Sequence, residues 1–176
     1  MKLSFRKLAE GKLGLSGRSG SALAESAEFC LHYNDHPEFV QITLSGDVRA
    51  VGILEWSAPE PKIASRTYGD LKRTVEDGAC AVAIVVVTQL EGFPAVMKTS
   101  QGSGFDYWLT SDDDTNLFLA RLEVSGILKG SASSIETREQ TKIKQTSKSD
   151  DTRLTAYTAI VEFGGPEVRT TKRNCD

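Results

Sequence analysis

The order of hydrophobic and polar residues along the chain changes its period near residue 60. Before that point, apolar residues occupy every second position at 29–33 and 40–44, and a third apolar run follows at 51–56. A period of two is typical of strands that bury one face. Turn-forming residues such as Asn, Asp, Gly and Pro separate the three runs. The segment from 27 to 57 is therefore predicted to form an antiparallel β-meander.

A helical spacing of apolar residues replaces this alternation after Pro59 and Pro61, which interrupt the chain. The spacing predicts a helix over residues 69–90, with Gly78 as its weakest point. Its valine-rich end, residues 82–87, is also compatible with a buried strand.

Five further elements are predicted in the second half of the chain. Strands are expected at residues 93–99, 105–109 and 120–127, where apolar residues alternate or follow turn-forming glycines. Residues 133–149 are polar and rich in lysine, begin with serines that favour helix starts, and are predicted to be helical. A last strand is expected at residues 156–163.

Residues 1–24 combine Gly and Ser with Lys and Arg, and no regular element is predicted there. Two interpretations of this cationic arm are open: it contacts phosphates, or it is a solvated, partly ordered terminus. The predicted organisation is a basic arm and β-meander over residues 1–60 and an αβββαβ core over residues 61–176. The two parts are expected to pack as one compact α+β unit.

The composition of the 176-residue chain is that of a globular protein, with 39% hydrophobic and 26% charged residues. A formal net charge of −3 excludes a strongly basic nucleic-acid-binding protein on bulk charge. The longest apolar run, residues 79–87, is too short for a membrane span, which needs ~20 residues. No contact with a membrane is therefore expected.

The three cysteines, Cys30, Cys80 and Cys175, lie far apart and show no C-x-x-C spacing. This scatter argues against a zinc site and against a disulfide framework. The first residues also lack the apolar segment of a secretory signal. Together these features predict a cytoplasmic protein with free thiols.

Two carboxylates are of interest because their strands are predicted to be neighbours. Asp106 follows a glycine turn, and Glu123 lies inside an apolar run that is expected to be buried. Two acids held close together repel each other unless a proton or a cation lies between them. Oxygen ligands suit Mg²⁺ or Mn²⁺, and such an ion is able to activate water for attack on a phosphate.

These residues resemble the motif of the PD-(D/E)XK nuclease superfamily. Gly104-Phe105-Asp106 matches the part with the first acid, and Glu123-Val124-Ser125 matches the part with the second. The resemblance covers residues 69–163 and implies a restriction-endonuclease-like αβββαβ core that binds Mg²⁺ and cuts phosphodiester bonds. It also implies a further metal ligand on the first helix, for which Glu76 is the candidate.

The chain departs from the superfamily motif at Ser125, because serine cannot supply the positive charge of the motif's lysine. In some members a lysine of the following helix takes this role, and here that helix carries Lys142, Lys144 and Lys148. Lys144 and Lys148 share one face, which Gln140 extends. The expected catalytic set is Asp106, Glu123, Lys144, Lys148 and Gln140, with Asp106, Glu123 and Glu76 as metal ligands.

Structural interpretations of the same residues stay open. Asp106 is able to cap the glycine turn, and Glu123 is able to form an ion pair at the rim with Arg121 or with a lysine of a neighbouring strand. Tyr107 and Trp108 are expected to be core and rim aromatics more than platforms for nucleobases. The lysines of the helix predicted at residues 133–149 are compatible with a solvated face as well as with a surface that contacts phosphates.

Three functions are compatible with these features. The first is a metal-dependent nuclease that hydrolyses DNA. The alternative is a catalytically inactive nuclease-like subunit or binding module of a larger prokaryotic-type assembly, with protein partners on its N-terminal sheet. A small α+β domain that binds a peptide or a small molecule is the third.

Overall fold

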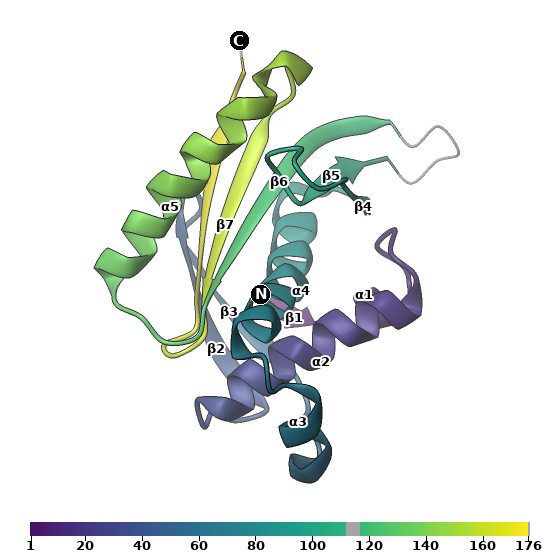
Figure 1. Ribbon diagram of the computed structural model, residues 1–176, viewed down its shortest axis with the longest axis vertical. Helices are drawn as coiled ribbons and strands as arrows, with labels where there is room; N and C mark the ends of the chain where they lie inside the picture. Colours follow the sequence, from purple (N-terminus) through teal and green to yellow (C-terminus); the bar gives the residue numbers. More distant parts are fainter. Residues whose placement is uncertain (112–116, 176) are drawn as a thin grey trace.

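The computed structural model describes residues 1–111 and 117–175, and within them it forms one eight-stranded mixed sheet with helices on both faces (Figure 1). The strand order is β1-β3-β2-β8-β7-β6-β5-β4. The strands are β1 (Lys2–Ser4), β2 (Phe39–Gly46), β3 (Ala50–Glu55), β4 (Ala95–Lys98), β5 (Tyr107–Thr110), β6 (Phe118–Ile127), β7 (Ala156–Glu162) and β8 (Glu167–Arg173). The helices are α1 (Arg6–Ala9), α2 (Gly17–Tyr33), α3 (Pro61–Thr67), α4 (Leu71–Glu91), α5 (Ala132–Thr146) and the 3-10 helix η1 (Ser147–Thr152).

The predicted α+β class is confirmed, and so are the elements predicted between residues 69 and 163. Strands β4, β5 and β6 pair antiparallel in sequence order, and β7 returns parallel to β6 after α5. Asp70 caps the start of α4 by accepting the N–H of Arg73 at 3.1 Å, and Gly92 follows its last residue in a left-handed conformation. The alternative of a strand at residues 82–87 is wrong, because α4 runs through them.

The predicted three-stranded meander over residues 27–57 is wrong in its first strand, because residues 29–33 form the last turns of α2. The prediction of no regular element in residues 1–24 is also wrong, since β1, α1 and the first half of α2 lie there. Ser16 caps α2 by accepting the N–H of Ser19 at 3.3 Å. The buried residues of α2 include Ala24, Ala27 and Leu31, which recur at helical spacing. Five alternating residues are too few to outweigh that longer pattern.

Helix α3 and strand β8 also had no counterpart in the prediction. Helix α3 starts at Pro61, directly after the expected boundary, and the carboxylate of Glu60 caps it. Strand β8 pairs antiparallel with β7 and parallel with β2, where Thr43–Gly46 align with Glu167–Thr170. The segments 1–60 and 61–176 therefore share one continuous sheet.

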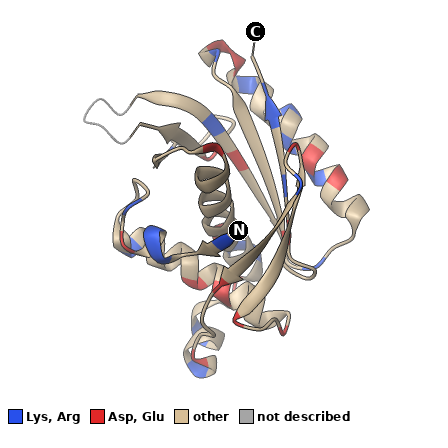
Figure 2. Cartoon of the chain, turned by 180° about the vertical axis from the view of Figure 1, so that it is seen from behind, with Lys and Arg blue, Asp and Glu red and all other residues tan. Residues whose placement is uncertain are grey.

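Helix α4 forms the centre of the core, with the sheet on one side and α2 on the other. Figure 2 shows its central turns without charged residues, whereas α5 carries charges of both signs. Two glycines allow the close approach: a Cβ on Gly78 would lie 2.9 Å from backbone atoms of Ala27, and one on Gly126 would lie 2.4 Å from the Val75 carbonyl oxygen. Although α4 is apolar, no helix in the described part of the chain meets the length and hydropathy needed to cross a membrane.

Replacing Gly78 with Ala is expected to lower the free energy of unfolding by about 1 kcal/mol or more, because the added methyl group overlaps the backbone of α2. Helix propensity alone would raise stability by about 1 kcal/mol, so a net loss isolates the packing effect. Urea unfolding measures the change. Gly69→Ala is the matched control, since nothing lies within 4 Å of its Cβ position. A Gly78→Ala protein that is more stable than the original would contradict the tight α2–α4 contact.

Candidate active site

Three polar side chains of β6 lie buried on the face of the sheet that α5 covers. Side chains alternate between the two faces of a strand, so Arg121, Glu123 and Ser125 share one face. The other face packs on α4, as the contact between Gly126 and Val75 indicates. The exposed fractions of Arg121, Glu123 and Ser125 are 0%, 1% and 6%. Buried polar groups need hydrogen-bond partners, and α5 and the neighbouring loops supply them.

Asp106 lies across from Glu123, immediately before β5. Its backbone N–H donates to the carbonyl oxygen of Leu122, and its Oδ2 accepts the N–H of Val124 at 2.8 Å. These two bonds flank Glu123 along β6, so the structure brings the two expected acids together. The bond to Val124 means that the Asp106 carboxylate reaches across to β6.

The two oxygens of the Glu123 carboxylate have different surroundings. Oε1 accepts hydrogen bonds from Lys142 Nζ and from Gln145 Nε2, the second at 2.9 Å. Oε2 is buried and has no hydrogen-bond partner among the described residues. Burial raises the pKa of Glu123, the charge of Asp106 raises it further, and Lys142 lowers it, which leaves the pKa at about 7. Near neutral pH the carboxyl group therefore exchanges between its protonated and ionised forms.

Helix α5 turns a different face to the two acids from the one that the sequence suggested. Lys142 and Gln145 are three residues apart and lie on its sheet side. Lys144 and Gln140 are exposed, because a helix turns about 100° per residue and position 144 lies about 200° from position 142. Lys148 is exposed as well, yet it lines the cavity beside the acids. Lys144 and Gln140 are thus directed away from the site.

Glu76 is exposed on α4, which packs on the face of the sheet opposite to Glu123. Its neighbours at 74, 75, 78 and 79 are the ones that face the core. The next residue, Asp77, is half-buried, and its charge is one of the minor causes that raise the pKa of Cys80 to about 12, after burial and the charge of Asp106. Asp77 therefore lies near Cys80 on α4, and α4 packs on the face of the sheet opposite to Glu123.

Ser125 stands where the superfamily motif has its lysine, and it also faces α5. Its Oγ accepts a hydrogen bond from Arg138 Nη1 at 3.4 Å. The positions of Ile135, Arg138, Lys142 and Gln145 follow the spacing i, i+3, i+7 and i+10 along one side of α5. Ile135 is buried, so it marks that side as the one facing the sheet. This apolar residue was the signal that could have identified Lys142 and Gln145 from the sequence.

A polar cavity of about 360 Å³ opens beside the two acids. Its wall consists of residues 98–106 together with Glu123, Gln145 and Lys148. The loop is held by hydrogen bonds from Thr99 Oγ1 to the Phe105 carbonyl oxygen and from Ser149 Oγ to the Ser103 carbonyl oxygen. A larger hollow of about 800 Å³ lies between β1 and the end of α4, but Glu55 is the only acid among its lining residues.

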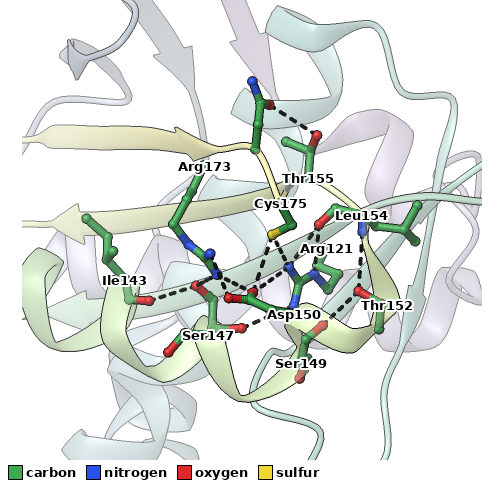
Figure 3. A network of polar contacts seen from close by, with 12 residues as sticks. Arg121, Ile143, Ser147, Ser149, Asp150, Thr152, Leu154, Thr155, Arg173 and Cys175 are labelled. Carbon is green, nitrogen blue, oxygen red and sulfur yellow. Dashed lines mark hydrogen bonds and ion pairs between the residues drawn. The ribbon is translucent and has the colours of Figure 1, made fainter.

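A buried guanidinium group fixes α5 and η1 against β6 (Figure 3). Arg121 donates to the carbonyl oxygens of Thr146 and Leu154 at 3.1 and 2.8 Å and to Asp150 Oδ1 at 3.2 Å. Arg173 of β8 donates to the same Oδ1 at 2.6 Å and holds the pKa of Asp150 well below its usual range. Arg121 therefore pairs with Asp150, and the alternative of an Arg121–Glu123 ion pair is wrong.

No disulfide bond joins the cysteines within the described residues. All three are free, and Cys175 Sγ lies 2.9 Å from Arg121 Nη2 at the edge of this network. Burial raises the pKa of the Cys30 thiol to about 12, so it stays protonated.

Comparisons of the chain with protein-family models, with curated proteins and with solved structures give no match. The functional assignment therefore depends on the geometry of the site.

Replacing Lys142 with Ala is expected to raise the pKa of Glu123 above 7, because the ammonium group that favours the ionised form is removed. Asp106→Asn is expected to lower the same pKa, because a repelling charge is lost. Carbon-13 NMR of the glutamate carboxyl group in metal-free protein measures both shifts. Lys144→Ala, which removes an exposed lysine of the same helix, is the control and should leave the pKa unchanged. A value near 4.5 in the unaltered protein would contradict the described surroundings of Glu123.

The stability of the metal-free protein should depend on this group between about pH 4.5 and 7. Folded Glu123 keeps a proton that the unfolded chain releases above its ordinary pKa of 4.5, so its contribution lowers the free energy of unfolding as the pH rises through that window. Glu123→Gln does not titrate and should remove this part of the pH dependence. Urea unfolding at pH 4.5, 6 and 7.5 compares the two proteins, and equal slopes would disagree with the expectation.

Proposed function

We propose that this protein is a metal-dependent nuclease that hydrolyses phosphodiester bonds of DNA. The observation that carries the proposal is the pair formed by Asp106 and the buried Glu123, whose Oε2 has no hydrogen-bond partner among the described residues. An interior carboxylate oxygen without a partner is unfavourable unless a proton or a cation binds it. A carboxylate pair of this kind is a common device for holding a divalent ion next to a phosphate.

The donor set fits Mg²⁺ or Mn²⁺. Within residues 1–111 and 117–175 no three side chains of His, Cys, Asp or Glu converge, so Asp106 and Glu123 would be the protein's ligands. Mg²⁺ often uses only one or two carboxylates and keeps several waters or phosphate oxygens. When bound, such an ion acts as a Lewis acid toward a phosphate oxygen and makes a nucleophilic water available near neutral pH. Glu76 is exposed and is not among the residues that line the cavity, so it is not included in this donor set.

Lys142 supplies the positive charge that Ser125 cannot supply. An ammonium group has three N–H donors, and two of them are directed to Glu123 Oε1 and, at 3.4 Å, to Gln145 Oε1. The third is available for a phosphate oxygen or a water. Gln145 donates to Glu123 as well, so it positions both groups. Lys98 and Lys148 at the cavity wall add charge suited to a phosphate backbone.

The topology of the second half of the chain supports the same proposal. The antiparallel order β4–β5–β6, the helix α5 and the parallel strand β7 agree with the αβββαβ core implied by the resemblance to the PD-(D/E)XK superfamily. Asp106 directly precedes its second strand, Glu123 lies on its third, and the lysine comes from its second helix. Residues 1–60 and β8 extend this core on one side.

The alternative of a non-catalytic subunit draws support from the β2–β3 hairpin. Phe39, Val51 and Ile53 on these strands are 58%, 52% and 39% exposed. Apolar side chains grouped on one exposed sheet face are typical of protein contacts. Under this alternative the Asp106–Glu123 pair would be a remnant, and the protein would join a larger assembly through the hairpin.

Asp106→Asn and Glu123→Gln are each expected to reduce cleavage by about 100-fold or more, because each removes a charge that the transition state requires. Lys142→Ala should reduce it by at least about tenfold. The assay follows the release of labelled fragments from linear, nicked and single-stranded DNA with Mg²⁺ or Mn²⁺. Excess EDTA should abolish the reaction.

Two matched variants serve as controls for this assay. Glu76→Gln removes an exposed charge from α4, and Lys144→Ala removes one from α5. Neither change alters the two acids, so both variants should cut DNA as the unaltered protein does. A protein that leaves all three DNA forms intact with either ion would rule out the nuclease and favour the non-catalytic alternative. Cleavage that survives Asp106→Asn would move the reaction to another site.

A further inference from the structure

Three aromatic rings form a continuous row along β5 and β6. The Phe105 and Trp108 rings meet edge to face, with centroids 4.5 Å apart and planes at 76°. Trp108 and Phe118 are stacked, with centroids 4.3 Å apart and planes at 14°. Offset stacks and edge contacts are the favoured ring geometries, so each ring fixes the orientation of the next.

The row starts at the candidate active site and ends at the surface. Phe105 is adjacent to Asp106 in the chain, is buried, and lines the same cavity. Trp108 is half-buried and Phe118 is 41% exposed. Trp108 pairs with Arg121 on β6, two residues before Glu123, so the row lies on the same face of the sheet as the acids. The structure thus joins a polar cavity to an exposed ring on one surface.

We propose that the exposed face of Phe118 binds a nucleobase of a single-stranded segment, on the same face of the sheet as the acids and about 16 Å along β6 from Glu123. The proposal deepens the proposed nuclease function and rests on it. A base stacked on Phe118 becomes the next member of the row, because Trp108 already holds the Phe118 ring in a stacked arrangement.

The chemistry of the patch favours a nucleobase of a single strand as its occupant. Met97, which pairs with Trp108 and so shares its face of the sheet, is 36% exposed. It extends the apolar surface beside the row, while Lys98 and Lys148 lie toward the cavity. Every base has a face that stacks on an aromatic ring. In a duplex those faces are covered by neighbouring bases, so a ring on an open surface selects unpaired nucleotides.

Fluorescence anisotropy of a labelled single-stranded oligodeoxynucleotide, in EDTA so that no cleavage occurs, tests this proposal. Phe118→Ala should weaken binding by about tenfold, since base–aromatic stacking contributes on that scale. An oligonucleotide of equal length made of abasic sites should bind weakly and lose little more in Phe118→Ala. Phe118→Trp should restore binding of the base-bearing strand. Phe39→Ala, which removes a 58% exposed ring from β2, should have no effect.

Equal binding by Phe118→Ala and Phe39→Ala, or equal affinity for the abasic strand, would overturn the proposal. So would self-association of the protein that Phe118→Ala abolishes, because a second copy would then occupy the ring. Failure of the nuclease proposal is distinguishable: base-dependent binding through Phe118 with no cleavage under any ion would remove hydrolysis and keep the platform. Cleavage with unchanged binding in Phe118→Ala would keep hydrolysis and remove the platform.

Discussion

The carboxylate of Glu123 lies in the protein interior next to a second carboxylate, and the arrangement of α5 depends on meeting that charge. Burial of a lone carboxylate is costly, and a neighbouring Asp106 increases the cost. Lys142 and Gln145 offset part of it from one side of α5, through the single oxygen Oε1. The other oxygen keeps no protein partner within the described residues. A proton on Glu123 reduces the remaining cost, and under the proposed function a divalent cation would do the same.

Helix α5 is held to the sheet mainly by polar contacts. Only Ile135 and Thr146 are buried along its length, so hydrophobic burial contributes little to its docking. Arg121 under its last turn and the ion pair of Glu139 with Arg169 on β8 hold it instead. Hydrogen bonds are directional, which a hydrophobic contact is not. The position of Lys142 relative to Glu123 is therefore set by a polar framework that spans β6, β8 and η1.

Much of the second half of the chain could be predicted because α4, β6 and α5 are long and turn-forming glycines mark the short strands between them. The acids could be predicted too, since a charged residue inside an apolar run of β6 is conspicuous. The choice between Lys142 and Lys144 required the side of α5 that faces the sheet, and only Ile135 marks that side. Strand β8 escaped prediction because its sequence is polar on one face, where ion pairs with α5 replace apolar contacts. The residues 29–33 were misleading because a short alternation fits two kinds of element.

The parallel pairing of β2 with β8 has a consequence for the synthesis of this protein. The edge of β2 that accepts β8 is complete once residue 46 leaves the ribosome, but its partner begins about 120 residues later. At ordinary elongation rates of about 5–20 residues per second, that edge waits for roughly 6 to 25 seconds. During this interval it is open to strands of neighbouring nascent chains. Faster translation, or a chaperone that shields the edge, would therefore raise the yield of native protein.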